Sequence, residues 1–201
     1  MKSKILFTLS FATVIIFCAY SYLYLDIAVA SYFYETKPFN GFFEVVTAFG
    51  KSKWYLIAFA IFFLLFRYIF RLREAANRFL YFFIAVGASG LIVDILKFVF
   101  GRARPKLFFE QGIYGIKFLG TEHLYFSIPS GHSATAFSLG VGVALFFPRF
   151  ALPAFAAAAI VAFSRVAITA HYLSDIVAGA YIGAVFAIWL KHKMIQKGVR
   201  F

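Results

Sequence analysis

Residues 79–100 read FLYFFIAVGASGLIVDILKFVF, and this stretch indicates the class of fold. It is apolar over most of its length, and about 20 helical residues are enough to cross the roughly 30 Å hydrocarbon core of a bilayer. Its last third nevertheless carries Asp94 and Lys97. Charged side chains close to hydrocarbon are unfavourable, so residues of this kind are candidates for a functional role.

The rest of the 201-residue chain has the same character, with 63% hydrophobic residues and a mean hydropathy of +0.86. This composition is far more apolar than that of a soluble domain. We therefore expect an all-α, polytopic membrane protein that forms a single domain over residues 1–201, with long connections at 26–53 and 101–131. The six expected transmembrane spans are Ile5–Leu25, Trp54–Phe70, Phe79–Phe100, His132–Phe147, Ala151–Ile168 and Ile176–Leu190.

Basic residues at the span ends indicate which side faces the cytoplasm, because cytoplasmic flanks collect Lys and Arg. On one side of the membrane they accompany a single acid, Glu74. These basic residues are Lys2, Lys4, Arg67, Arg71, Arg73, Arg78, Arg149, Lys191, Lys193, Lys197 and Arg200. The opposite side is nearly balanced in charge, so both termini are expected in the cytoplasm.

Two other interpretations of these features have less support from the sequence. The formal net charge of +12 does not indicate a nucleic acid partner, because the basic residues lie at the ends of apolar segments and not on one water-facing surface. Lys2, Lys4 and the small residues 28–30 are also compatible with a cleaved signal peptide. The first apolar stretch is long for a signal peptide, which favours a retained anchor.

Polar residues gather at the ends of four of the expected spans. With alternating spans, all of these positions fall at the extracytoplasmic ends, so four segments should meet at one level of the membrane. The residues are Asp94, Lys97, Arg102 and Arg104 near the end of span three, Ser130, Gly131 and His132 at the start of span four, Ser164 and Arg165 near the end of span five, and His171 and Asp175 at the start of span six.

The cations in this set suit a phosphate group. Lys97, Arg104 and Arg165 can surround a dianion, and arginine offers a fork that matches phosphate oxygens. Gly131 allows close approach of the backbone, and a helix that opens at Ser130 would direct free N–H groups at an anion. These residues predict an oxyanion cradle.

Two histidines remain for chemistry. His171 has Asp175 one helical turn later, so the carboxylate can hold one ring nitrogen and direct the other towards phosphorus. His132 lies on another segment and can act as the acid for the leaving oxygen. The sequence offers no carboxylate cluster of the kind that magnesium uses.

Other polar residues near these positions have simpler interpretations. Asp94, three residues before Lys97, is expected to neutralise that lysine on one helix face. Arg102 is either a spare phosphate contact or a charge that faces lipid headgroups. Ser174 can cap span six. The remaining candidates are interpreted as solvated loop residues, namely Lys117, Glu122 and His123.

Taken together, these residues resemble the three signature segments of the type 2 phosphatidic acid phosphatase family. The first segment, Lys followed after six residues by Arg-Pro, matches Lys97 to Pro105. The second, Pro-Ser-Gly-His, matches Pro129 to His132. The third, Ser-Arg, five residues, His, three residues, Asp, matches Ser164 to Asp175. The resemblance covers about residues 79–190, and the first two spans carry no signature of their own.

The resemblance implies a function and a role for each signature residue. His171 would attack phosphorus and form a phosphohistidine, Asp175 would orient it, and His132 would protonate the leaving alcohol and then activate water. The phosphate would be bound by Lys97, Arg104, Ser130, Gly131 and Arg165. The resemblance also implies that neither a metal nor another cofactor is needed. The six spans and small size argue against the soluble vanadate-dependent haloperoxidases of the same family.

The expected substrate is a phosphorylated lipid, and the candidates are phosphatidylglycerol phosphate, undecaprenyl diphosphate, phosphatidic acid and the lipid A 1-phosphate. The expected location is the bacterial inner membrane, with the site facing the periplasm or exterior. The alternative is a transporter or scaffold that binds anionic lipid without turning it over. Such a protein needs the cations but has no use for two facing histidines.

Overall fold

The computed structural model describes residues 2–201 and is helical, with no β-strand in that range. Met1 lies outside the described residues, as do the side chains at positions 2–4 and 40, which include the two lysines used to orient span one. The α-helices are α1 (Lys2–Tyr20), α2 (Asp26–Thr36), α3 (Asn40–Ala48), α4 (Ser52–Leu64), α5 (Arg73–Phe100), α6 (Pro105–Gln111), α7 (Gly131–Phe146), α8 (Ala151–Ala167) and α9 (Leu173–Gln196). The π-helical turns are η1 (Ser21–Leu25) and η2 (Leu65–Ile69), and the 3-10 turns are η3 (His123–Tyr125) and η4 (Pro148–Phe150).

Five helical runs are long and apolar enough to cross a membrane, and α7 is a shorter apolar helix of 16 residues. The five runs are Ile5–Thr36, Gly41–Ile69, Arg73–Phe100, Pro148–Ala167 and Leu173–Gln196. Large apolar side chains face outward along them; Leu152 is 81% exposed and Leu6 is 70% exposed. The prediction of an all-α, polytopic integral membrane protein is confirmed, because a surface of this kind needs lipid around it.

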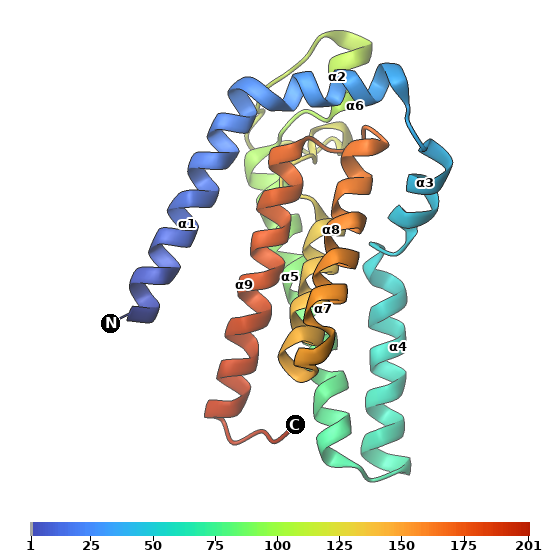
Figure 1. Ribbon diagram of the computed structural model, residues 1–201, viewed down its shortest axis with the longest axis vertical. Helices are drawn as coiled ribbons and strands as arrows, with labels where there is room; N and C mark the ends of the chain where they lie inside the picture. The colour runs from blue at the N-terminus through green and yellow to red at the C-terminus, as the bar shows by residue number, and fades with distance from the viewer. Residues whose placement is uncertain (1) are drawn as a thin grey trace.

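The alternating direction of the helices brings four helix ends together. In Figure 1, α5 and α8 run upward while α7 and α9 run downward, so the last turns of the first pair meet the first turns of the second pair at the upper end. Both chain termini lie in the lower half of the view. The expected convergence of four segments at one level is therefore present in the fold.

The first span continues further than expected. Figure 1 shows that α1 rises beside the bundle and that α2 turns across its upper end, with the π-helical turn η1 between them. The connection expected over 26–53 is largely helical, since α2 and α3 occupy most of that range. Asp26, the residue after the expected end of span one, is fully buried and forms an ion pair of 2.7 Å with Arg102. A neutralised charge does not force the helix to end.

Helix α7 packs closely on α9 because two glycines of α9 face its backbone. A Cβ atom at Gly179 would collide with the backbone of Ser130, and one at Gly183 would collide with that of Ala134. Small residues four positions apart are a common means of close helix approach in membranes. The Ser130 N–H also donates to the Asp175 carbonyl at 2.9 Å. The first turns of α7 and α9 are thereby held in contact.

Candidate active site

Three cations surround the upper ends of α5, α7 and α8. Lys97, Arg104 and Arg165 lie within electrostatic range of one another. Arg104 donates one hydrogen bond to the Phe126 carbonyl at 3.2 Å, and Arg165 donates one to the Thr47 hydroxyl at 2.7 Å. Each arginine retains a buried Nε without a protein acceptor. Buried donors of this kind need a partner, and an anion between them would supply it.

The positive charge of this cluster is only partly compensated. Asp94 Oδ1 lies 3.3 Å from Lys97 Nζ, so the expected neutralisation of this lysine is confirmed. The Asp94 side chain is 72% exposed, and that of Lys97 is 14% exposed. Exposed ion pairs contribute little, so Lys97 remains available to an anion.

The start of α7 has the form expected for an anion site. Ser130 is the N-cap, and its hydroxyl accepts a hydrogen bond of 3.4 Å from the Ser133 N–H. A Cβ atom at Gly131 would stand 3.5 Å from Lys97 Nζ, so the lysine lies directly over the first turn. The free N–H groups of that turn and the Lys97 ammonium group favour the same negative ligand.

His171 lies in the short segment between α8 and α9, and it is buried, with 2% of its surface exposed. Its Nδ1 lies 3.6 Å from Asp175 Oδ2, so Nε2 points away from the carboxylate. Burial lowers the pKa of His171 to about 4, although Asp175 raises it in part. The imidazole is therefore neutral at physiological pH, the state that a nucleophile requires.

His132 lies on the first turn of α7, within electrostatic range of His171, Arg165 and Lys97. It lines a cavity of about 310 Å³ together with Lys97, Gly131 and residues 50–53. The structure thus brings the two predicted histidines and the three predicted cations into one cluster. Their chemical roles remain a proposal.

Comparison with known proteins identifies the family. The sequence model of the PAP2 superfamily matches residues 78–198, more than half of the chain. The chain belongs to the PAP2 superfamily. All three predicted signature segments lie inside the matched range, whereas Asp26 and the segment from Thr47 to Lys51 lie outside it.

Two relatives of this PAP2 chain are named lipid A 1-phosphatase. The protein from Rhizobium johnstonii is 33% identical over 155 residues, which cover 72% of this chain and 64% of the relative. The protein from Rhizobium etli is 32% identical over 155 residues, covering 72% of this chain and 67% of the relative. This chain therefore spans slightly less than two thirds of the length of the first relative.

Two solved structures share the PAP2 fold seen here. The crystal structure of Aquifex aeolicus LpxE has a TM-score of 0.63 and 20% identity, covering 84% of this chain and 95% of that one. The transmembrane PAP2-type phosphatidylglycerolphosphate phosphatase from Bacillus subtilis has a TM-score of 0.67 and 22% identity, covering 92% and 94%. At these identities the likeness concerns the fold alone.

Residues outside the PAP2 signature segments complete the site, and the sequence analysis missed them. A Cβ atom at Gly50 would stand 2.5 Å from His132 Cδ2, so the turn between α3 and α4 packs directly on this histidine. Lys51 lies within electrostatic range of His132, and Thr47 holds Arg165. The only signal in the sequence was the Gly50-Lys51 pair ahead of span two, which resembles an ordinary span boundary.

Two interpretations of polar residues at variable positions within the PAP2 signature segments are wrong. Arg102 neither contacts a phosphate site nor faces headgroups, because it is fully buried between Asp26 and Asp175. Ser174 does not cap α9, whose N-cap is Tyr172; its hydroxyl instead donates to Asp26 at 2.5 Å. Both side chains are bound to Asp26, which is far from them in the sequence, and local spacing does not predict such a contact.

The interpretation of Lys117, Glu122 and His123 as solvated loop residues is supported, with one refinement. Lys117 and Glu122 form an exposed ion pair of 3.1 Å. His123 is exposed, but it lines a cavity of about 450 Å³ that also includes Arg104 and Ala170. The charge of Arg104, and to a smaller extent burial, lowers the pKa of His123. His123 therefore lies within electrostatic range of Arg104, one of the three cations of the site.

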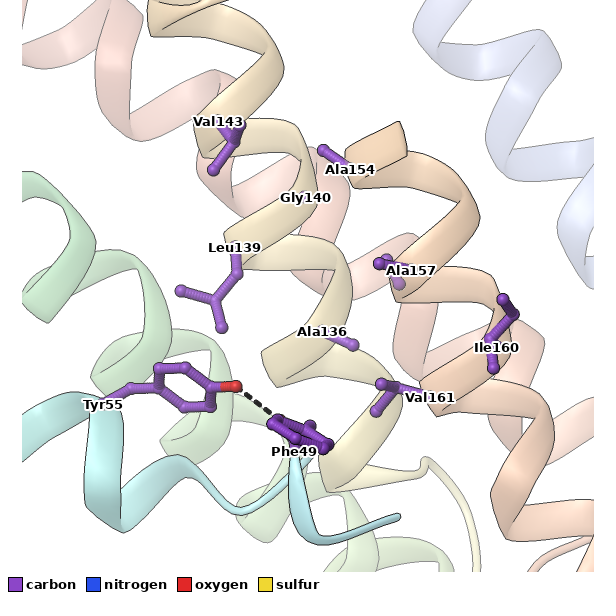
Figure 2. A pocket seen from close by; sticks show the side chains of 11 residues that line it. Phe49, Tyr55, Ala136, Leu139, Gly140, Val143, Ala154, Ala157, Ile160 and Val161 are labelled. Atoms are coloured by element: carbon purple, nitrogen blue, oxygen red, sulfur yellow. Dashed lines mark hydrogen bonds between the residues drawn. The ribbon is translucent and has the colours of Figure 1, made fainter. Parts of the chain in front are cut away.

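An apolar groove descends from the site along the membrane-spanning part of this PAP2 chain. Its volume is about 410 Å³, and it lies between α7 and α8 and beside Tyr55 of α4. Figure 2 shows Ala136 and Val161 at one end and Val143 and Ala154 at the other. Because Ala136 follows His132 by four residues and Val161 precedes Arg165 by four, the groove begins about one helical turn below the site.

Proposed function

We propose that this chain is a membrane lipid phosphatase that hydrolyses a phosphomonoester or diphosphate of a lipid at the extracytoplasmic face, through a phosphohistidine intermediate. One observation carries the proposal: a buried neutral His171 backed by Asp175 lies in one cluster with His132 and three cations. Family membership supports the same reaction class. The whole chain, 1–201, acts as one domain, with its catalytic core at about 79–190.

In the first step His171 Nε2 attacks phosphorus, and the bond from phosphorus to the leaving oxygen breaks. His132, which takes up a proton when the phosphate dianion lies among the cations, gives this proton to the leaving oxygen. A neutral lipid alcohol then departs, or a lipid monophosphate when the substrate is a diphosphate. The positive charge that forms on the His171 ring is stabilised by Asp175, which accepts the Nδ1–H bond. The product of this step is a phosphohistidine.

In the second step His132, now neutral, takes a proton from water, and the resulting hydroxide attacks phosphorus. The phosphorus–nitrogen bond breaks, which releases inorganic phosphate and returns His171 to its neutral form. In both steps Lys97, Arg104 and Arg165, with the Ser130 hydroxyl and the N–H group of Gly131, stabilise the equatorial oxygens of the transferring group.

The reaction is proposed to need no metal. The two buried carboxylates nearest the site, Asp26 and Asp175, are already bound by Arg102 at 2.7 Å and 2.6 Å. Guanidinium and ammonium groups provide the charge that Mg²⁺ supplies in many phosphoryl-transfer enzymes. Activity is therefore expected to survive EDTA.

The substrate is proposed to be a lipid whose phosphate lies at the membrane surface and whose chains remain in hydrocarbon. The apolar groove below His132 and Arg165 suits an acyl chain, since it is lined by small and aliphatic side chains and aromatic rings. The names of the two Rhizobium relatives favour the 1-phosphate of lipid A. The other candidates are phosphatidylglycerol phosphate, undecaprenyl diphosphate and phosphatidic acid.

The site is proposed to face the periplasm or exterior of a bacterial inner membrane. Basic residues dominate the opposite end of the bundle, at the α4–α5 turn and after α9, and such flanks favour the cytoplasm. With this orientation both termini are cytoplasmic.

The test is phosphate release by the purified full chain from the four lipids, with and without EDTA. We expect release from at least one lipid in EDTA, and its loss in His171→Ala. The matched control is His192→Ala, because His192 is exposed at the opposite end of α9. Retained lipid binding without phosphate release in the wild-type chain would instead indicate an anionic-lipid transporter or scaffold. Release that requires Mg²⁺ would contradict the proposed mechanism.

A further inference from the structure

A buried charge network joins the bend between α1 and α2 to the carboxylate behind His171. We propose that Asp26 and Arg102 act as one positioning unit, which holds Asp175 in the orientation and charge state that His171 needs. Neither residue touches the substrate, and Asp26 lies outside the range that defines the family. The inference rests on the proposed function, because it assigns a role to residues around the proposed nucleophile.

Arg102 is the centre of this network and is completely buried. One terminal nitrogen, Nη1, donates to Asp175 Oδ1 at 2.6 Å and to the Ser174 hydroxyl at 2.6 Å. The other, Nη2, donates to Asp26 Oδ2 at 2.7 Å and to the Tyr114 hydroxyl at 3.0 Å. Burial alone would lower the pKa of Arg102, but Asp175 and Asp26 raise it overall. The guanidinium therefore bridges two carboxylates as a permanent cation.

The two oxygens of Asp175 have separate tasks. Oδ1 accepts from Arg102, whereas Oδ2 accepts from the Ser127 hydroxyl at 2.5 Å and from the Tyr172 N–H at 2.9 Å. It is Oδ2 that faces His171 Nδ1. Because donors approach both oxygens, the carboxylate cannot rotate without breaking a charge-assisted hydrogen bond, and such bonds are the stronger ones. Arg102 thus fixes the oxygen that directs the histidine.

Asp26 balances the charge of Arg102. It also accepts hydrogen bonds from the Ser174 N–H at 3.0 Å and from the Ser21 hydroxyl at 2.7 Å. If Arg102 faced Asp175 alone, the pair would be neutral and would stabilise a cationic imidazole less well. With Asp26 present, two carboxylates share one guanidinium, and a net negative charge remains beside His171. At the low effective dielectric of a buried site, that difference is large.

Aromatic rings close the network from water. The Arg102 guanidinium carbon lies 4.4 Å from the Tyr172 ring centre, 4.9 Å from that of Tyr22 and 5.5 Å from that of Tyr114. These contacts add cation–π attraction and exclude solvent that would screen the ion pairs. Tyr22 belongs to η1, so the turn between α1 and α2 supplies both a wall and, through Asp26, a charge.

The experiment measures kcat and KM for phosphate release by full-length Asp26→Asn, Arg102→Gln and the double variant. We expect each single substitution to lower kcat by about 10- to 100-fold, because small displacements of a reacting group have effects of this size. KM should change by less than about 3-fold, since the cations of the phosphate cradle are untouched. In the double variant Asp175 is the only charge left in the network. The fold-loss of kcat in the double variant should therefore be smaller than the product of the fold-losses in the two single variants.

The matched control is Tyr181→Phe, which removes the 3.0 Å hydrogen bond between Ser10 and Tyr181. This bond also ties α1 to α9 but lies away from Asp175, so kcat should stay at the wild-type value. Should a single charge variant fail to fold, Ser21→Ala removes only one hydroxyl donor to Asp26 and should lower kcat several-fold at unchanged KM. The inference would be overturned if the fold-loss of kcat in the double variant equalled the product of the two single losses. It would also be overturned if the single substitutions raised KM and left kcat unchanged.

The outcome separates this inference from the proposed function. Active wild-type protein with an inactive His171→Ala variant and a fully active Asp26→Asn variant would refute the positioning unit alone. Wild-type protein that released no phosphate from any of the four lipids would refute both. A wild-type chain with the expected loss of kcat in both single variants would support both.

Discussion

His171 Nδ1 faces Asp175 Oδ2 across 3.6 Å, in a region where the histidine is 2% exposed. The distance is slightly long for a hydrogen bond, and catalytic contacts often tighten only when substrate is bound. The carboxylate cannot approach freely, because Ser127 and the Tyr172 N–H already hold the same oxygen. A small movement of the imidazole is therefore enough to complete the pair.

The buried position of His171 predicts an unusual titration. Burial lowers its pKa from 6.5 to about 4, so the ring should be neutral throughout the physiological range and become protonated only in acid. The measurement is ¹H–¹³C NMR of histidine-labelled protein in micelles, with the signal assigned by its loss in His171→Asn. Because Asp175 raises this pKa, Asp175→Asn should lower it further. A midpoint at or above 6.5 in the wild-type chain would contradict the assignment.

The close approach of Gly50 to His132 predicts a second effect. Gly50→Ala should displace the imidazole and lower kcat/KM by about 10- to 100-fold, because a shift of about 1 Å in a reacting group has an effect of this order. Gly41→Ala is the control, since a Cβ atom there meets nothing within 4 Å. Phosphate-release kinetics on both variants check the expectation. If Gly50→Ala were as active as Gly41→Ala, the position of His132 would not matter for catalysis, and the prediction would be wrong.

Much of this arrangement could be predicted from the sequence, because its signals are local. Long apolar runs identified the membrane spans, and cations beside apolar runs identified candidates at Lys97, Arg104 and Arg165. The pair of His171 and Asp175 is predicted from a spacing of one helical turn, and the two side chains do face each other although His171 lies just before the start of α9. In each case a few neighbouring residues carry the physical reason for the assignment.

The remainder depends on contacts between distant segments. Asp26 and Arg102 are 76 positions apart, and nothing local to Asp26 indicates that a buried guanidinium will neutralise it. Arg102 closely resembles Arg104 in sequence, yet one is buried in an ion network and the other faces the candidate site. The importance of Gly50 comes from the packing of the turn between α3 and α4 on His132, which is distant in the sequence. All three features depend on the packing of distant segments, which the local sequence pattern does not predict.

The proposed orientation predicts which end of the bundle reacts with reagents outside the cell. Lys117→Cys, on an exposed side chain at the site end, should be labelled by a membrane-impermeant maleimide on intact cells. Lys193→Cys, exposed near the end of α9, should react only after the membrane is permeabilised. Native Cys18 is common to both variants. The reverse pattern would place the site at the cytoplasmic face.

The transfer of phosphate to His171 is the central claim, and trapping the intermediate tests it most directly. Purified protein is mixed with a ³²P-labelled lipid substrate, quenched within one turnover in alkaline denaturant, digested and mapped by mass spectrometry. We expect phosphate on the peptide that contains His171, and none in the His171→Ala variant. Phosphate on another residue, or turnover without any covalent phosphate, would contradict the mechanism.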